Sequence, residues 1–145
     1  MRDLTWFEFY LAAGNPSTPV YQLEHLVSHN DPKIRRRVAE NPGTPEFLLR
    51  SLAVDKDPEV RLAVSSSSAC PESLLRQLIR DPDPTVRFGL AEDANLPVEL
   101  LEILLQDDNG YVSYRAQKTL ASLRSSRFDN EPIDIFRGDS KRLYA

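Results

Sequence analysis

The chain has 145 residues, of which 41% are hydrophobic and 28% are charged. This size and composition are typical of one folded domain and too apolar for a wholly disordered protein, and the formal net charge of -4 argues against a general affinity for nucleic acid or anionic membranes. No run of about 20 apolar residues predicts a membrane span, and a single cysteine cannot form an internal disulfide, so we expect a cytoplasmic protein.

The first segment, residues 1–14, reads MRDLTWFEFYLAAG and predicts one short helix. A terminal helix of this kind covers the apolar end of whatever packs against it. A patch that binds a partner is the alternative interpretation. The residues concerned are Trp6, Phe7, Phe9 and Tyr10.

From residue 15 the sequence repeats every 26 residues, with no insertion or deletion. The second copy reads NPGTPEFLLRSLAVDKDPEVRLAVSS, and its proline, leucine, Asp-Pro and valine positions recur in the other copies. Residues 1–14 align with the second half of a copy. A fixed period of this length predicts a stack of similar units. The four copies span 15–40, 41–66, 67–92 and 93–118.

Each copy predicts two short helices. The first would begin at the proline after Thr18 or Thr44, with the threonine as the N-cap. The second would begin at the recurring Asp-Pro pair, with Asp31, Asp57 and Asp83 as N-caps. Because neither helix can bury its apolar stripe alone, we expect neighbouring copies to stack into an all-α solenoid.

This pattern resembles the leucine-rich repeat variant (LRV) proteins of bacteria and, more distantly, HEAT repeats. The resemblance covers residues 15–118. It implies a right-handed superhelix of paired helices and a general habit of binding partners, but no particular activity. Some members of the family carry a cysteine-rich iron–sulfur module, and this chain lacks the cysteines for one.

After the repeats, residues 119–145 have no proline-leucine frame. We expect the last helix to continue to about Arg124. Apolar residues of the remaining segment are expected to fold back as a C-terminal cap, namely Phe128, Ile133, Ile135 and Phe136.

Three arginines, Arg35, Arg61 and Arg87, each follow a buried Ile or Val by one residue. At the edge of the buried stripe, a guanidinium would reach the aspartate of its own or the next Asp-Pro turn, as a structural ladder with Asp31, Asp57 and Asp83. A row that reads phosphates or an acidic partner is the alternative. In the fourth copy Asn109 replaces the aspartate and Ser113 replaces the arginine. Because both residues are lost together, the sequence favours the structural ladder.

Catalytic motifs are missing from the sequence, which has no nucleophile elbow and no glycine-rich phosphate loop. His25 and His29 lie four residues apart but lack a third metal ligand. Cys70 occupies the position of Thr44 without a general base nearby, and we interpret it as a substituted cap. We therefore expect no enzyme, no metal and no cofactor.

One aligned position of the second helices, here called the apolar column, points away from the predicted core. It holds Arg36, Leu62, Phe88 and Tyr114, and Tyr111 lies one turn from Tyr114. A free surface should be polar there, but most of these residues are apolar. Either these side chains form an exposed track for a protein or peptide, or they are buried between repeats.

We expect a non-enzymatic protein–protein interaction scaffold. Its partner is unidentified, and a homodimer would use the same apolar track or the end caps. The alternative function is nucleic-acid binding through the basic run KIRRR, from Lys33 to Arg37, against which the acidic composition argues.

Overall fold

The computed structural model describes the backbone of residues 5–129 and the side chains of residues 5–125. Within these residues the protein consists of nine α-helices and no strand, so the prediction of an all-α fold is confirmed. No helix of the described part is long and apolar enough to cross a membrane. The helices are α1 (Trp6–Gly14), α2 (Val20–Leu26), α3 (Pro32–Ala39), α4 (Glu46–Leu52), α5 (Pro58–Ser65), α6 (Glu72–Leu78), α7 (Pro84–Glu92), α8 (Val98–Leu104) and α9 (Gly110–Asp129).

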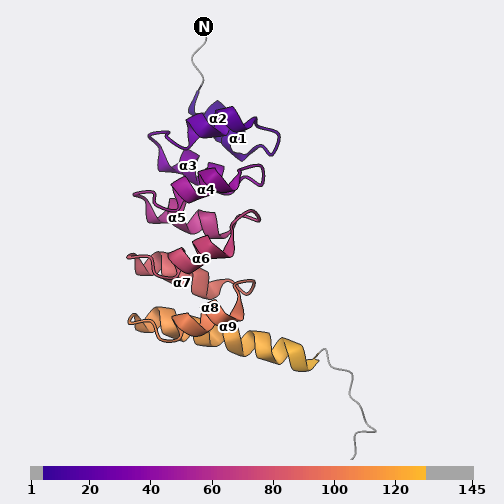
Figure 1. Ribbon diagram of the computed structural model, residues 1–145, viewed down its shortest axis with the longest axis vertical. Helices are drawn as coiled ribbons and strands as arrows, with labels where there is room; N and C mark the ends of the chain where they lie inside the picture. The colour runs from indigo at the N-terminus through magenta and orange to yellow at the C-terminus, as the bar shows by residue number, and fades with distance from the viewer. Residues whose placement is uncertain (1–4, 130–145) are drawn as a thin grey trace, which may run out of the picture.

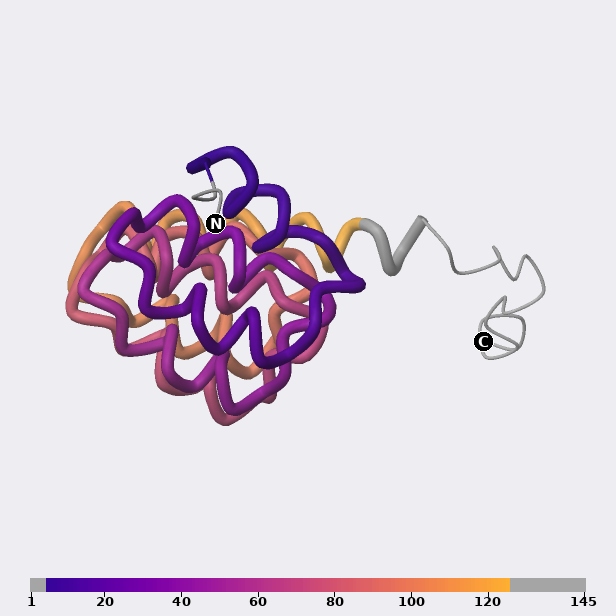
Figure 2. The backbone as a smooth tube through the Cα atoms, turned by 90° about the horizontal axis from the view of Figure 1, so that it is seen from above, coloured from indigo at the N-terminus to yellow at the C-terminus, as the bar shows by residue number. Residues whose placement is uncertain are grey.

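The helices follow one another in chain order along the long axis of the molecule (Figure 1). Helices α1, α3, α5, α7 and α9 form one row, here called the second-helix row, in which each packs directly on the next. Helices α2, α4, α6 and α8 each pack against the members of this row that precede and follow them in the chain. Seen from above, the turns of successive pairs lie nearly over one another (Figure 2).

Three of the second helices, α3, α5 and α7, begin as the Asp-Pro signal predicts. Asp31, Asp57 and Asp83 are N-caps, each followed by proline at the first helical position. The carboxylate of Asp57, for example, accepts a hydrogen bond from the backbone N–H of Glu59 at 2.9 Å. This bond satisfies one of the N–H groups that a helix start leaves unpaired.

The first helices begin differently from the prediction. Their N-caps are the prolines themselves, such as Pro45, and no side chain caps them. Thr44 is buried, and its hydroxyl donates backwards to the carbonyl of Val38 at 2.6 Å. Thr18 makes the same bond to the carbonyl of Ala12. The N-cap prediction for these threonines was wrong, because a tight turn directs the hydroxyl toward the last turn of the preceding helix.

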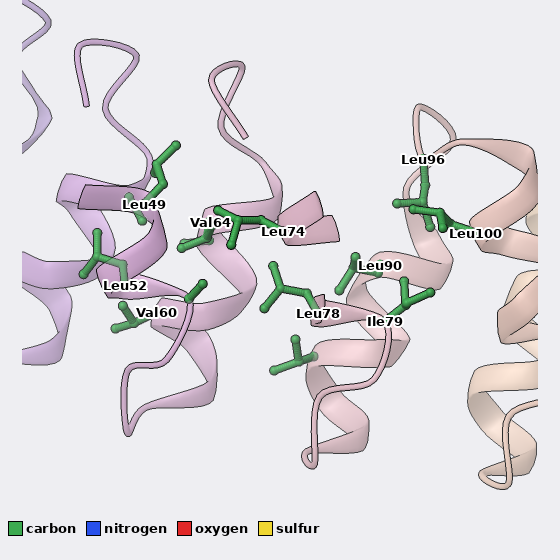
Figure 3. Packing of buried hydrophobic residues seen from close by; sticks show 14 of the residues in the cluster. Leu49, Leu52, Val60, Val64, Leu74, Leu78, Ile79, Leu90, Leu96 and Leu100 are labelled. Carbon is green, nitrogen blue, oxygen red and sulfur yellow. The ribbon is translucent and has the colours of Figure 1, made fainter. Parts of the chain in front are cut away.

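The core is a continuous line of aliphatic side chains between the helices (Figure 3). The residues aligned with Val60 in the second helices are almost fully buried in every pair, as are those aligned with Val64. Shortening Ile34 or Leu90 to alanine would leave a cavity that costs about 2–5 kcal/mol. These two positions are filled by Ile34, Val60, Val86 and Val112, and by Val38, Val64, Leu90 and Ala116.

The junction between α5 and α6 lacks bonds that the preceding junction has. The amide of Asn41 donates to the carbonyls of Ala13 and Asn15, both at 2.9 Å, and so ties two pairs together. Ser67 and Cys70 stand where Asn41 and Thr44 stand one copy earlier. A serine hydroxyl is too short to make the two hydrogen bonds that the asparagine amide makes to the preceding pair. The Cys70 thiol lies 3.8 Å from the carbonyl oxygen of its own neighbour, Pro71. This junction is therefore less strongly bonded.

The N-terminal helix α1 packs on α3 and is the first member of the second-helix row. Its start has a capping box, in which Thr5 and Glu8 bond each other's backbone. Trp6 is stacked on Tyr10 and donates its indole N–H to Asp31 at 2.7 Å, while Phe9 and Tyr10 pack against the core. Only part of the aromatic cluster covers the core, since Trp6 and Phe7 stay exposed.

At the other end, α9 runs to Asp129, five residues beyond the predicted end at Arg124. Its last part extends past the helix pairs to one side (Figure 1). The predicted C-terminal cap lies outside the described residues: Ile133, Ile135, Phe136 and the side chain of Phe128.

Candidate partner-binding surface

Arginine–aspartate pairs tie neighbouring helix pairs together at one edge of the stack. The Nε of Arg61 lies 2.7 Å from one carboxylate oxygen of Asp81, and its Nη2 lies 2.8 Å from the other. A further N–H of Arg61 donates to the backbone carbonyl of Asp55 at 2.8 Å. The same bidentate contact recurs between Arg35 and Asp55 and between Arg87 and Asp107.

The acidic partner differs from the expected one. The guanidiniums contact Asp55, Asp81 and Asp107, two residues before the Asp-Pro position, and not the N-cap aspartates. The N-cap carboxylates of Asp57 and Asp83 are already engaged by backbone N–H groups of their own helices. Asp31, the remaining N-cap of the predicted ladder, accepts from Lys33 N–H and from Trp6.

The arginine and aspartate side chains of these ion pairs are largely shielded from water, and within each pair the two charges neutralise each other. Arg61 and Asp81 side chains are 12% and 4% exposed. The guanidinium of Arg87 holds the pKa of Asp107 below its ordinary value despite the opposing effect of burial. The arrangement leaves Arg35, Arg61 and Arg87 committed to the structure, which disfavours the alternative of a row that reads phosphates.

The first junction carries an aromatic contact in place of an ion pair. Phe9 and His29 stand 26 residues before Arg35 and Asp55, and their rings lie 5.3 Å apart. The Nδ1 of His29 accepts the N–H of Asp31, as the Asp55 carboxylate accepts the N–H of Asp57. His29 therefore has a structural role, and among the described residues no cluster of three metal-ligating side chains is found.

The predicted apolar column is not uniformly exposed. Arg36 is exposed and forms ion pairs with Glu40 and Glu59 at 2.8 and 3.4 Å. Leu62 is half-buried and packs against Gly89 of the next pair, where a Cβ atom would lie 2.5 Å from a Leu62 methyl carbon. The interpretation of burial between repeats therefore applies to Leu62.

The aromatic end of the column is accessible. Phe88 is half-buried and lines a hollow of about 350 Å³ between the starts of α7 and α9, together with Pro84, Tyr111 and Val112. Tyr111 is 80% exposed and Tyr114, one turn later, is 58% exposed. Aromatic side chains beside an apolar hollow offer contact area at little entropic cost, which is typical of protein-binding surfaces.

Tyr114 lines a second hollow, one helical turn beyond Tyr111. The ammonium of Lys118 lies 5.4 Å from the Tyr114 ring centre, a cation–π distance. The second hollow measures about 590 Å³ and lies between the end of α8 and α9, where Leu105, Leu120 and Arg124 also line it. We call Phe88, Tyr111 and Tyr114 the aromatic surface.

Sequence reasoning missed a second set of exposed apolar residues, on the opposite row. Tyr21 and Phe47 occupy the same position of their copies, at the starts of α2 and α4, and both are exposed. Val54 is exposed in the turn after α4. The 26-residue alignment contained the signal for Tyr21 and Phe47, whose position holds Ser73 in the third copy.

Helix α3 places the residues of the basic run, Lys33 to Arg37, on different sides, so that some are buried and others exposed. Ile34 and Arg35 are buried, and Arg36 and Arg37 are both ion-paired with Glu40. The cations that face outward therefore occupy one short stretch of α3. Binding of nucleic acid through this run stays a prediction that duplex titration tests.

Cys70 lies in a setting that disfavours reactivity. Burial, reinforced by the nearby Glu46 carboxylate, raises the pKa of the Cys70 thiol to about 11. A helix N-terminus generally lowers the pKa of a thiol, but the half-buried surroundings of Cys70 penalise its thiolate form more strongly. The thiol is protonated at neutral pH.

Comparison of the chain with protein-family models, with curated proteins and with solved structures finds no match.

Proposed function

We propose that residues 15–118 form a right-handed α-solenoid of four LRV- or HEAT-like repeats, with 1–14 and 119–145 as end caps. Three features support this: the unbroken 26-residue period, the direct stacking of the second-helix row, and the ion pairs that recur at the same step. In such a stack each unit buries its apolar stripe only against its neighbours, so a continuous side face is left for binding.

The protein then acts as a non-enzymatic scaffold that binds a protein or peptide through the aromatic surface. The observation that carries this proposal is the exposure of Tyr111, which lines a hollow with Phe88, and of Tyr114 one turn later. Tyr111 and Tyr114 lie exposed on consecutive turns of α9, outside the core. The residues aligned with Tyr111 in the other copies, Lys33, Glu59 and Thr85, are all polar, so the tyrosine is not a requirement of the repeat.

The test compares three tagged proteins in affinity purification from the native host, with quantitative mass spectrometry. The Tyr111→Ser, Tyr114→Ser double variant should lose partners that the wild-type chain retains. The matched control, Tyr21→Ser with Phe47→Ser, removes two exposed aromatic residues from the other row and should keep these partners. Equal partner sets for wild type and the Tyr111, Tyr114 variant would refute the proposed surface.

A further inference from the structure

At the N-terminal end of the second-helix row, the side chain of Arg37 is held in place by its neighbours although one of its N–H groups makes no hydrogen bond. The side chain of Arg37 lies across Gly14, where a Cβ atom would come within 2.2 Å of the Arg37 Nε. Its guanidinium carbon sits 5.4 Å from the centre of the Tyr10 ring. The Nε is buried and has no hydrogen-bond partner. Gly14 and Tyr10 thus form a slot that orients the Arg37 guanidinium.

The outer end of this guanidinium faces a hollow of about 280 Å³ between α1 and α3. Lys33, Arg36, Arg37, Tyr10 and Glu40 line it. Three cations therefore face one carboxylate of the lining, and a second carboxylate, Glu59 of α5, lies 3.4 Å from Arg36. Glu40 pairs with both arginines, at 2.8 Å to Arg36 and 3.6 Å to Arg37.

No other described pair repeats this set of cations. The positions of Lys33, Arg36 and Arg37 hold Glu59, Leu62 and Ala63 in the second copy and Thr85, Phe88 and Gly89 in the third. The fourth copy keeps only the arginine aligned with Arg37, as Arg115. The Nε of Arg115 is also buried without a hydrogen bond, and it forms an ion pair with Glu92 at 3.3 Å. The concentration of cations is therefore specific to the α1–α3 hollow.

We propose that this hollow binds a phosphate monoester group. A tetrahedral oxyanion offers three acceptor oxygens, which matches donors from Lys33, Arg36 and Arg37 better than the two oxygens of one carboxylate do. A dianion also brings more charge than Glu40, so it displaces the Glu40 carboxylate, whose side chain is partly exposed and free to turn toward water. Pre-orientation of Arg37 by Gly14 and Tyr10 lowers the entropic cost of binding.

A small phosphate ligand fits this site better than a nucleic-acid duplex. Duplex DNA carries one negative charge per roughly 1.7 Å of its axis, so it needs a track of cations. Along the second-helix row the cationic hollow is followed by Glu59 and Glu92, which repel such a polyanion. The site lies at the opposite end of the row from the aromatic surface, so neither proposal depends on the other (Figure 1).

The experiment is a titration of the isotope-labelled full chain at constant ionic strength, followed by amide NMR shifts. The probes are inorganic phosphate, O-phosphoserine and a short DNA duplex. We expect saturable shifts around Tyr10 and residues 33–40 with both phosphates, and the tighter of the two shows whether the group is free or carried by a larger ligand. Arg37→Gln should weaken binding about tenfold or more, because it removes a charge-assisted hydrogen bond.

Two variants make the test specific. Arg115→Gln removes the aligned arginine of the last copy and should leave phosphate binding unchanged. Gly14→Ala places a Cβ atom where the Arg37 side chain lies and should weaken binding while all cations are kept. Shifts that grow linearly without saturation, an equal loss in Arg115→Gln, or a preference for the duplex over both phosphates would each overturn the proposal.

Discussion

Arg61 donates hydrogen bonds to both carboxylate oxygens of Asp81, which belongs to the neighbouring helix pair, at 2.7 and 2.8 Å. The contact is bidentate and largely shielded from solvent, so its two charges depend on each other. Replacing Arg61 with methionine keeps much of the packing of the stem but leaves the Asp81 carboxylate buried without its counter-charge.

We expect Arg61→Met to lower the free energy of unfolding by about 3 kcal/mol. Arg50→Met is the control, because the Arg50–Glu46 pair is about half exposed and should contribute less than about 0.5 kcal/mol. Urea denaturation of both variants measures the difference. Similar losses in the two variants would show that the Arg61–Asp81 pair contributes no more than a surface pair.

The Arg87–Asp107 pair predicts how stability depends on pH. Arg87 lowers the pKa of Asp107, so the folded state binds this proton less readily than the unfolded chain. The resulting stabilisation is present above the unfolded pKa, near 3.8, and is lost as the pH falls through the lower folded pKa. Asp107→Asn should therefore be less stable than wild type at pH 7, and the gap should narrow below about pH 4.

Thermal unfolding of wild type and Asp107→Asn between pH 2.5 and 7 measures this gap. A gap that stays constant over the whole range would mean that the Asp107 charge does not stabilise the fold.

The sequence predicted the helices better than it predicted their contacts. Proline and aspartate act through their own backbone, so the starts of α3, α5 and α7 could be assigned from single residues. Thr44 was misassigned because a threonine before a helical proline is typical of an N-cap, and only the turn geometry sends its hydroxyl to Val38.

Contacts between copies were the less predictable part. The alignment identified the arginine column, but whether Arg35 binds Asp55 or Asp57 depends on which carboxylate the helix start has already used. The burial of Leu62 depends on the absence of a side chain at Gly89 in the next copy, a relationship between different columns. The exposure of Tyr111 and Tyr114 was one of two open alternatives until the packing of α9 was known.

The Phe9–His29 contact predicts that an additional ion pair can be built. Phe9→Arg with His29→Asp recreates the residues found at the later junctions. Each single change should destabilise the fold, by leaving a charge without its partner, and the double variant should recover part of the loss. A double-mutant cycle by urea denaturation should give a favourable coupling of about 1 kcal/mol or more. A coupling near zero would contradict the structural equivalence of the two sites.

The weak junction at Cys70 predicts a stabilising substitution. Threonine at this position supplies the hydroxyl that Thr18 and Thr44 donate to the preceding helix, here to the carbonyl of Val64. We expect Cys70→Thr to raise the free energy of unfolding by about 1 kcal/mol. Cys70→Val has the same shape without the hydroxyl and should not stabilise. If valine stabilises as much as threonine, the gain comes from packing and the proposed hydrogen bond is absent.

The aromatic surface is tested most directly by site-specific cross-linking in the native host. A photoreactive phenylalanine analogue replaces Tyr114 in one protein and Tyr21, which is at least as exposed, in another. Adducts are identified by mass spectrometry after irradiation. We expect an adduct with a defined partner protein from position 114 and none from position 21. A partner captured from position 21 alone, or no adduct at position 114, would contradict it.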